Sequence, residues 1–412
     1  MRANNPDVVV VGAGIAGASI AAVLARGGVE VLLLERQRGY RDRVRGEYMA
    51  PWGVLEARAL GLEDVIRSTQ AVDARYSVPY DELFAQSGAE EAKSDRSTIF
   101  PDVWGPLCAC HPKTCQALAE NAVRSGAELV WGVGEVRVQT GKRPSVTFRN
   151  GAEREVRPRL IIGADGRAST VRKQSCIHIN KAPATHVIAG LLVEGASRWP
   201  DDQYAIGVER DLLVYVFPQG GGRVRLYTCH ANEQATRWAG RTGTRRFVEA
   251  FAGLRSIPAS LGLGDVTPAG PCATFSGEQT WCDEPYADGV VLLGDAGGYD
   301  DPVDGQGLSL ALRDARQLSE LLLASGDWTV ATLRPYGDQR GERLRRMRRV
   351  SKTFAALMTN FTDAGRARRD RYYAAASAGQ EDVRMALGAI FRGPDRLPSE
   401  AFTDQLHESL LA

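Results

Sequence analysis

Residues 7–36 read DVVVVGAGIAGASIAAVLARGGVEVLLLER and decide the fold of the N-terminal part of the chain. Asp7–Val11 is β-branched after its first residue, which is typical of a parallel strand buried on both faces. Glycines follow at G-x-G-x-x-G spacing, and an alanine-rich stretch then favours a helix. A second apolar run ends at Glu35. The stretch therefore predicts a strand, a tight turn, a helix and a second strand, which together form a nucleotide-binding unit.

The three glycines each meet a different steric demand of a dinucleotide site. Gly12 permits the sharp turn, and Gly14 lets a pyrophosphate approach the backbone because it has no Cβ. Gly17 lets the helix pack closely on the strand. The N–H groups near Ile15 and Ala16 are expected to face the diphosphate, with the positive end of the helix dipole behind them.

The acidic residue at the end of the second strand makes the glycine pattern more specific. Glu35 is expected to accept hydrogen bonds from the adenosine ribose and would repel a 2′-phosphate. Arg36 follows it directly and belongs to the same predicted cofactor site. This unit fits NAD and FAD equally well.

Two later segments repeat the combination of an apolar strand and a glycine turn. Residues 159–172, RLIIGADGRASTVR, place Asp165 in such a turn, with a helix expected from Ser169. Residues 289–321 contain a third strand that ends in Gly294-Asp295. A Gly- and Asp-rich loop and a long helix follow that strand.

Taken in order, the three motifs resemble the p-hydroxybenzoate hydroxylase-like family of FAD-dependent monooxygenases. The fingerprints of that family are G-x-G-x-x-G, a D-G motif, and a G-D motif followed by P-x-x-G-Q-G. Pro302, Gly305, Gln306 and Gly307 match the last motif in register. The resemblance implies an α/β fold: a Rossmann-like FAD-binding domain with a parallel sheet and helices, an inserted β-rich substrate domain, and a C-terminal helical region.

The resemblance also implies roles for the third motif. Asp295 would bind the ribityl hydroxyls of the flavin, whereas the alternative is an ordinary helix N-cap. Pro302 and Gly305 belong to a loop that would lie against the isoalloxazine and shape its pocket. The N–H groups of Gly307 and Leu308 would point at flavin N1 and O2, where the helix dipole stabilises the anionic reduced flavin.

Three further cofactor contacts follow from the family pattern. Asp165 would both contact the cofactor and support the structure of its turn. An aspartate that only closes the turn is an equally good alternative. Arg45 matches an arginine placed near the flavin and its diphosphate, and the alternative is a surface arginine. His111 stands where an FAD-contacting arginine usually precedes the helix expected at Thr114–Ser125.

The chain departs from the family at two positions of the third motif. Gly298 replaces the histidine of the common G-D-A-A-H, so a proton relay is not assigned there. Ser309 replaces the asparagine after G-Q-G and retains a hydrogen-bonding group.

The motifs suggest a discontinuous domain organisation. Residues 1–75, 105–180 and 281–330 are assigned to the FAD-binding domain, residues 76–104 and 181–280 to the β-rich substrate domain, and residues 331–412 to the C-terminal helical region. The β-rich part contains strand-like runs separated by turn signals. These runs are Val187–Glu194, Tyr204–Val208, Leu212–Phe217 and Arg223–Cys229, with Gly220–Gly222 marking a hairpin.

Aromatic side chains of these strands are candidates for contact with a substrate. In the resembled family such a sheet roofs the pocket over the flavin ring. Tyr215, Phe217 and Tyr227 are the substrate candidates, although core packing is the better interpretation for any single one of them.

The C-terminal part contains the basic run RGERLRRMRR, from Arg340 to Arg349. It could bind the phosphates of a nicotinamide cofactor, but we favour a solvated helix face paired with acidic residues. Residues 360–412 carry no assignable motif. They could cap the substrate pocket or form an oligomer interface, and the oligomeric state is left open.

Composition points to an enzyme of ordinary size in a reducing compartment. The formal net charge of +1 over 412 residues gives no electrostatic case for nucleic acid, and no apolar run suggests membrane insertion. The seven cysteines favour free thiols over a disulfide framework, and Cys108, Cys110, His111 and Cys115 lack the spacing of a zinc site. We therefore expect a cytoplasmic protein without a metal.

The resemblance implies the chemistry as well as the cofactor. A non-covalently bound FAD, a small-molecule substrate and O2 are expected, with hydroxylation or epoxidation of an electron-rich substrate through a flavin C4a-hydroperoxide. Secondary-metabolite biosynthesis is the setting that we associate with such an enzyme. Because the chain has one dinucleotide fingerprint, NAD(P)H would bind transiently or a separate flavin reductase would supply electrons. Tyr215-Val216-Phe217-Pro218 resembles a segment of geranylgeranyl reductases, which makes an FAD-dependent reductase the main alternative. A flavin-dependent halogenase and a non-catalytic flavin-binding protein are the others.

Overall fold

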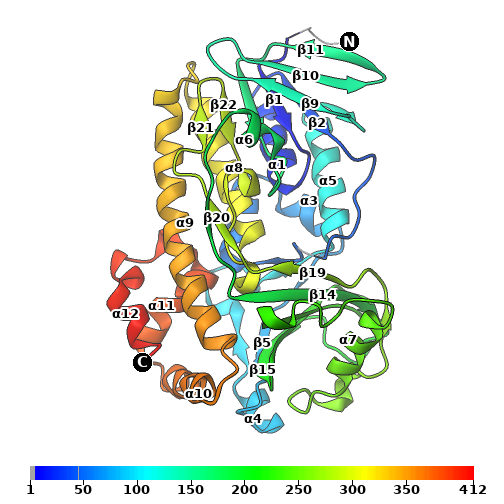
Figure 1. Ribbon diagram of the computed structural model, residues 1–412, viewed down its shortest axis with the longest axis vertical. Helices are drawn as coiled ribbons and strands as arrows, with labels where there is room; N and C mark the ends of the chain where they lie inside the picture. The colour runs from blue at the N-terminus through cyan, green and yellow to red at the C-terminus, as the bar shows by residue number, and fades with distance from the viewer. Residues whose placement is uncertain (1–4, 45) are drawn as a thin grey trace.

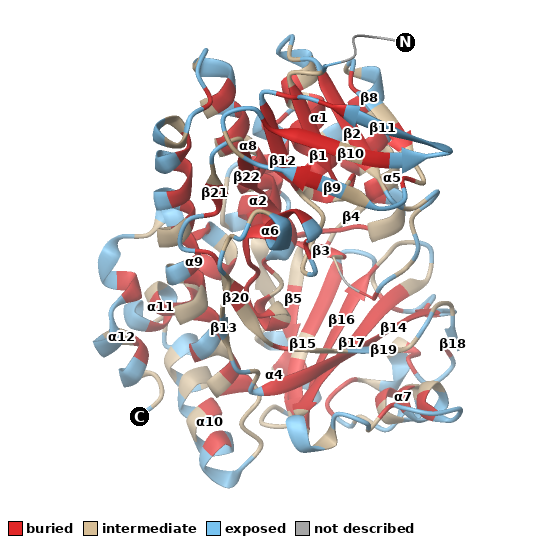
Figure 2. Ribbon diagram, turned by 45° about the horizontal axis from the view of Figure 1, so that its top comes forward, coloured by how far each residue is buried: buried red, intermediate tan, exposed pale blue. Residues whose placement is uncertain are grey.

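The structure is a computed structural model that describes residues 5–44 and 46–412. It has two sheet-based halves, one above the other in Figure 1, and a set of C-terminal helices running along one side of both. Figure 2 shows that the strands of both halves are largely buried. The α/β fold class expected from the sequence is confirmed.

The N-terminal half is built on a six-stranded sheet in the order β21-β22-β12-β1-β2-β8. All neighbouring pairs in it are parallel except β21 with β22. Because β1, β12 and β22 are adjacent, the three motif turns lie side by side at the carboxyl edge of the sheet. The strands are β1 (Val8–Val11), β2 (Val31–Glu35), β8 (Glu128–Trp131), β12 (Leu160–Gly163), β21 (Tyr286–Ala287) and β22 (Val290–Leu292).

Helices cover this sheet and form its main hydrophobic core. α1 (Ile15–Arg26) packs between α5 (His111–Arg124) and α8 (Gly307–Ala324). The opposite face meets a three-stranded sheet, β9 (Val136–Gln139), β10 (Ser145–Asn150) and β11 (Ala152–Val156). Shorter helices complete this half; they are α2 (Pro51–Ala59), α3 (Glu63–Arg67) and α6 (Thr170–Gln174).

The second half is an eight-stranded, mostly antiparallel sheet that contains all four strands expected from the sequence. Each of the four is longer than expected by one or two residues. Two strands from residues 76–104 extend the same sheet. Its members are β5 (Tyr76–Pro79), β6 (Ser94–Asp95), β14 (His186–Glu194), β15 (Gln203–Glu209), β16 (Leu212–Pro218), β17 (Arg223–Ala231), β18 (Thr267–Pro268) and β19 (Ala273–Ser276).

Short elements join the two halves and cover the outer face of the large sheet. α7 (Gly243–Ala252) packs on that outer face through a separate apolar cluster, and α4 (Gln86–Glu91) lies beside β5. The connecting pairs are β3 (Tyr48–Met49) and β4 (Val72–Asp73) on β7 (Leu107–Cys108), and β13 (Asn180–Ala182) on β20 (Gln279–Trp281).

The C-terminal region consists of four helices. α9 (Val330–Met358) spans both halves (Figure 1), and α10 (Asp363–Ser377), α11 (Glu381–Arg392) and α12 (Asp404–Ser409) fold back beside the large sheet. Within residues 5–44 and 46–412, each helix is too short or too polar to cross a bilayer.

The expectation of a solvated basic face on α9 is wrong for two of its arginines. Arg340 and Arg343 are only 2% and 1% exposed, because this side of α9 packs on α8 and both guanidinium groups pair with the buried Asp314. Arg345 does follow the expectation, since it is 50% exposed and pairs with Glu342. Arg346 pairs with Glu342 too, but it also contacts Pro394 and Phe402 of the C-terminal segment.

Candidate functional site

A cavity of about 1470 Å³ lies between the two halves. Its walls include the three motif turns at one end and the aromatic face of the large sheet at the other. Pockets for a single small ligand usually measure roughly 300–1,000 Å³. The cavity can therefore hold a dinucleotide and a second molecule together.

The surroundings of the glycines in the first motif are compatible with the roles predicted from their spacing. Gly12 has φ of +101°, and a Cβ there would lie 2.5 Å from the carbonyl oxygen of Ala164. A Cβ on Gly17 would lie 1.8 Å from the Gly12 carbonyl oxygen, so helix α1 can approach the turn only with glycine there. A Cβ on Gly14 would meet no protein atom within 4 Å, because Gly14 faces the cavity.

The N-terminus of α1 opens into the same cavity. Ile15 and Ala16 line it, and the first N–H in the helix to find an intrahelical partner is that of Ala18. Free N–H groups at a helix start attract an anion. This arrangement fits the diphosphate contact proposed for these residues.

Glu35 lies at the end of β2, beside the turn. Its two carboxylate oxygens accept hydrogen bonds from the backbone N–H groups of Ala13, at 2.9 Å, and Gln37, at 2.8 Å. Each oxygen retains a lone pair for a ribose hydroxyl. Arg36 also lines the cavity, as does Tyr40, a residue that the sequence reasoning missed.

Asp165 lines the cavity but serves mainly as a helix cap. It accepts hydrogen bonds from the Ser169 hydroxyl at 2.5 Å and from the N–H groups of Thr170 and Val171 at 2.6 and 3.1 Å. These contacts favour the turn-closing alternative, and its part in cofactor binding stays a prediction.

Asp295 is more open than Asp165. It lies on a short 3-10 turn, Gly294–Gly297, and its side chain is 38% exposed and borders the cavity. Arg167 approaches it, with Nε 3.5 Å from Oδ2, and also stacks over the Tyr299 ring. Sequence reasoning missed Arg167, although its place directly after Asp165-Gly166 was a usable signal.

The two departures from the family pattern have structural reasons. A Cβ at Gly298, where φ is +117°, would lie 2.5 Å from the Thr280 carbonyl oxygen, so β20 leaves no room for a histidine. The Ser309 hydroxyl accepts a hydrogen bond from the N–H of Ala50 and so fastens α8 to the start of α2.

The third motif forms a loop against the cavity. Pro302 begins a 3-10 turn, Gly305 follows with φ of +72°, and Gly307 and Leu308 start α8. A Cβ on Gly307 would meet no protein atom within 4 Å. These residues line the cavity, so the N-termini of α1 and α8 both open toward it.

His111 and Arg45 differ in what can be said of them. His111 is the first residue of α5, three residues earlier than the expected helix start, and it lines the cavity beside Gly46. Arg45 lies outside the described residues, and its proposed contact stays a prediction.

The other end of the cavity is aromatic. Tyr215, Phe217 and Tyr227 are each 8% exposed, and all three line it. Phe217 packs against Tyr48 and Tyr204, with ring centroids 5.1 and 6.0 Å apart. The three substrate candidates therefore pack in the hydrophobic core and also line the cavity.

Two of these tyrosines are tied to other parts of the site. The Tyr215 hydroxyl donates to the carbonyl oxygen of Val303 at 2.5 Å, which links the large sheet to the loop of the third motif, residues 300–306, called the flavin loop below. The Tyr227 hydroxyl donates to Glu47, whose pKa is raised by burial although Arg225 acts in the opposite direction.

The C-terminal helices close the aromatic end. Tyr372 and Tyr373 of α10 and Leu387 and Phe391 of α11 line the cavity. Of the two functions left open for residues 360–412, the structure supports that of a pocket cap. The side-chain amide of Gln306 donates to the Ile390 carbonyl oxygen at 3.2 Å, so the cap is attached to the flavin loop itself.

A buried carboxyl pair supports the flavin loop from behind. The Ser351 hydroxyl oxygen lies 2.7 Å from an oxygen of Asp300 and 2.6 Å from an oxygen of Asp304. A hydroxyl has one hydrogen to donate, so at least one carboxyl must carry a proton. Burial raises the pKa of Asp300 to about 7 and that of Asp304 well above its usual value. Within residues 5–44 and 46–412, no group of His, Cys, Asp and Glu is arranged to hold a metal ion.

The fold and the cavity define a dinucleotide-binding protein with an adjoining substrate chamber. A family model described as "FAD binding domain" matches residues 5–351, and the chain belongs to this family. The resemblance drawn from the three motifs, and FAD as the cofactor, are thereby confirmed. The residues fit FAD, because open glycines and two helix N-termini meet in a cavity bordered by Glu35 and Asp295.

Similar proteins include both oxygenases and reductases. The chain is 26% identical over 330 residues to squalene epoxidase 2 of Arabidopsis thaliana, covering 77% of this chain and 54% of that protein. It thus spans little more than half of that relative. Digeranylgeranylglycerophospholipid reductase 2 of Methanopyrus kandleri is 25% identical, with 95% of this chain and 97% of the reductase covered. The p-nitrophenol 4-monooxygenase PnpA of Pseudomonas putida shares the fold, with a TM-score of 0.80, 20% identity, and coverage of 95% of this chain and 99% of PnpA.

Proposed function

We propose that the protein is an FAD-dependent monooxygenase that hydroxylates or epoxidises an electron-rich organic molecule. The observation that carries this proposal is the continuous cavity that joins the dinucleotide site to a chamber lined by aromatic residues. A chamber of this kind excludes water and lets substrate lie against the reactive part of the cofactor.

When bound and reduced, FAD would activate O2, so that one of the two oxygen atoms of O2 can be transferred to the substrate. The residues of the chain bind the cofactor and enclose the substrate. The N-terminus of α1 and Glu35 hold the nucleotide, Asp295 holds the ribityl chain, and the N-terminus of α8 places positive potential at the flavin ring. The Tyr215 contact to Val303 keeps the loop against the large sheet.

Reduction of the flavin needs an electron donor from outside the chain. Within the described residues there is one parallel sheet of the dinucleotide-binding type. We propose that NAD(P)H binds transiently or that a separate flavin reductase delivers electrons. All seven cysteines are free thiols, which supports the proposed cytoplasmic location.

A reductase of the geranylgeranyl type is the second candidate. One observation favours it: the match to the Methanopyrus kandleri reductase covers nearly the whole length of both proteins. The apolar chamber also suits an isoprenoid chain. The two candidates differ in whether oxygen enters the product or a C=C bond is saturated.

Product analysis under labelled oxygen separates these candidates. The purified yellow protein, chemically reduced FAD and a panel of polycyclic aromatic, indole and polyene compounds are mixed under ¹⁸O₂. We expect one labelled oxygen atom in the product of at least one compound. Saturation of a double bond under argon would replace the proposal with the reductase. A halogenated product in added bromide or chloride would replace it with a halogenase, and flavin turnover without any product would favour a non-catalytic flavoprotein.

A further inference from the structure

The turn that carries Asp295 is held from behind by one arginine of α9. Arg340 donates to the carbonyl oxygens of Gly294, Gly297 and Gly298, at 2.9, 2.8 and 2.9 Å. Its Nε donates to Asp314 at 2.8 Å. One planar guanidinium therefore meets three carbonyls of a five-residue turn.

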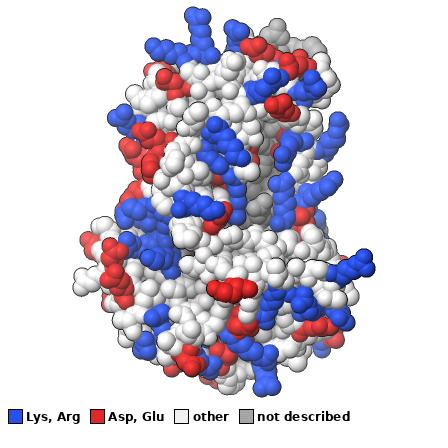
Figure 3. All heavy atoms as spheres, in the orientation of Figure 1, with Lys and Arg blue, Asp and Glu red and all other residues white. Residues whose placement is uncertain are grey.

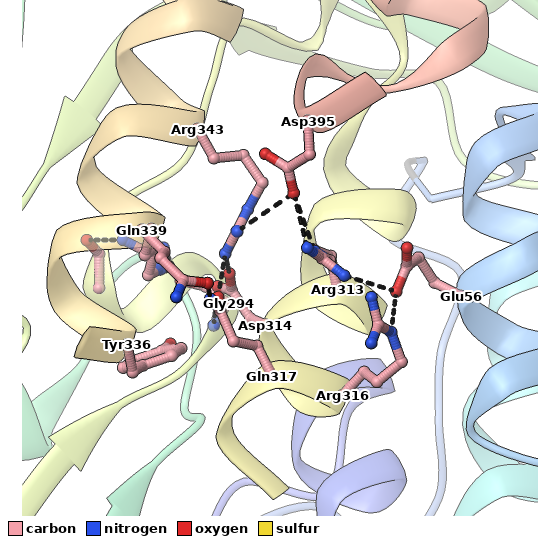
Figure 4. Close-up of polar contacts among 12 residues, drawn as sticks. Glu56, Gly294, Arg313, Asp314, Arg316, Gln317, Tyr336, Gln339, Arg343 and Asp395 are labelled. Carbon is pink, nitrogen blue, oxygen red and sulfur yellow. Dashed lines mark hydrogen bonds and ion pairs between the residues drawn. The ribbon is translucent and has the colours of Figure 1, made fainter. Parts of the chain in front are cut away.

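Asp314 of α8 completes this arrangement. The carboxylate oxygen that accepts from Arg340 also accepts from the N–H of Gly294, at 3.2 Å. Its other oxygen accepts from Arg343 at 2.7 Å. Figure 4 shows Arg343 and Asp314 facing each other from α9 and α8, with Asp395 on the far side of Arg343.

The arrangement is almost fully buried and tightly fitted, and it lies at the edge of the cavity. Arg340 and Asp314 are each 2% exposed. A Cβ at Gly297 would lie 3.2 Å from Cζ of Arg340, so the guanidinium lies directly against that backbone. On the other side the turn meets β20, where Gly298 leaves no space for a side chain. The turn therefore has little freedom to move.

This places the turn's carbonyl oxygens and the Asp295 side chain in different surroundings. The carbonyls of Gly294, Gly297 and Gly298 bond to Arg340, whereas the Asp295 carboxylate borders the cavity. A buried guanidinium that already has a carboxylate partner and carbonyl acceptors is unsuited to bind a ligand directly. Its three contacts to the turn carbonyls make the turn the main route by which Arg340 can affect a ligand.

We infer that Arg340 is a positioning residue for FAD: it fixes the Gly294–Gly298 turn so that Asp295 meets the ribityl chain in one defined orientation. The inference rests on the FAD site of the proposed function and not on the reaction catalysed there. Preorganised contacts of this kind improve affinity because the ligand does not have to order them on binding.

FAD affinity of the refolded apoprotein tests this inference. The variants are Arg340→Met, which removes the donors, and Arg340→Lys, which retains a charge and part of the bonding. Arg345→Met is the matched control, because Arg345 lies on the same helix, is 50% exposed and pairs with Glu342. Dissociation constants come from quenching of flavin fluorescence, and melting of each apoprotein reports on folding.

We expect Arg340→Met to weaken FAD binding at least tenfold, Arg340→Lys to restore part of that loss, and Arg345→Met to bind like the parent. Combination with Asp295→Ala is decisive. If Arg340 acts through Asp295, the double variant binds FAD little worse than Asp295→Ala alone. A general structural role predicts additive losses instead, and that result would overturn the inference.

Parent-like affinity in a folded Arg340→Met variant would also overturn it. Should that variant fail to fold, Gly297→Ala provides the second test, because its methyl group displaces the guanidinium while leaving every charge in place. A loss of affinity is expected there too, and unchanged affinity would contradict the inference. None of these measurements uses catalysis, so they can succeed even if the monooxygenase proposal fails.

Discussion

At the scale of single residues, the site depends on acids that differ in what surrounds them. Asp165 is occupied by backbone and hydroxyl donors, Asp295 is partly open to the cavity, and Asp300 and Asp304 share one hydroxyl. All four occur in or beside glycine turns of the sequence. The motifs singled out Asp165 and Asp295 as proposed cofactor contacts, which stay predictions. The contacts of Asp165, Asp300 and Asp304 became visible only with the partners from α6 and α9 in place.

The open acid gives the most direct residue-level prediction. Replacing Asp295 with Ala removes a charged acceptor for the ribityl hydroxyls, a bond worth about 1.5–3 kcal/mol. FAD affinity should fall by about one to two decades. Fluorescence titration of the apoprotein measures this. An unchanged affinity in the folded variant would mean that Asp295 does not contact the cofactor.

The shared proton gives a prediction about pH and stability. Burial raises the pKa of Asp300 to about 7, and the charged or titratable groups around the pair are Asp301, Arg348 and His186. A carboxyl with a raised pKa in the folded state contributes stability that is full below about pH 4, the usual pKa of Asp. That contribution is lost as the pH rises to about 7.

The protein should therefore lose stability between about pH 4 and pH 7 relative to Asp300→Asn, by a difference on the order of a few kcal/mol. Thermal melting of both proteins across this range tests the prediction. Parallel melting curves at every pH would show that Asp300 is ionised in the fold as it is in water. Asp338→Asn, a change on α9 distant in sequence from the pair, serves as the control.

At the scale of elements, the flavin loop has several independent attachments. Tyr215 holds it from the large sheet, Ile390 of α11 accepts a hydrogen bond from Gln306 of the loop, and Ser351 holds it from α9. The sequence predicted the loop from its glycines and proline. It could not predict these attachments, because each partner lies more than 40 residues away and on a different element.

Pro302 limits the freedom of this loop before any attachment is made. Replacing it with Gly restores backbone freedom, which loosens the loop and lets water reach the flavin. We expect reduced flavin to be oxidised by O2 at a near-normal rate, with more hydrogen peroxide and less product per flavin. Peroxide assays beside product analysis measure this coupling. Equal product yield in variant and parent would show that Pro302 does not shape the chamber.

At the scale of the whole molecule, charges of both signs are spread over the face shown in Figure 3. The parallel sheet and its turns could be predicted because their signals are local: apolar runs, glycine spacing and a terminal acid. The covering of the cavity by residues 360–412 could not be predicted. Residues 360–412 carry no motif, and their position depends on how the long helix α9 packs against both halves.

A ligand in a cavity between two halves should stabilise both. FAD at 100 times its dissociation constant adds about 2.7 kcal/mol to the free energy of unfolding. We expect added FAD to raise the melting temperature of the apoprotein by a few degrees in one cooperative transition. Two separate transitions, with only one responding to FAD, would indicate that the halves unfold independently. Calorimetry with and without FAD distinguishes these outcomes.

The length of α9 has a consequence for how such a protein can diversify. Arg340 near its middle secures the cofactor turn, whereas Phe354 and Met358 near its end already line the substrate chamber. After Met358, α10 and α11 line the substrate end of the cavity, and α11 meets the flavin loop through the contact of Gln306 with the Ile390 carbonyl oxygen. Exchanging the segment that begins at residue 359 for that of a relative should then alter substrate choice, provided that the new segment keeps this contact. The end of α9 is thus a position at which the segment that covers the substrate chamber can be exchanged, so that substrate specificity can change without a new cofactor-binding domain.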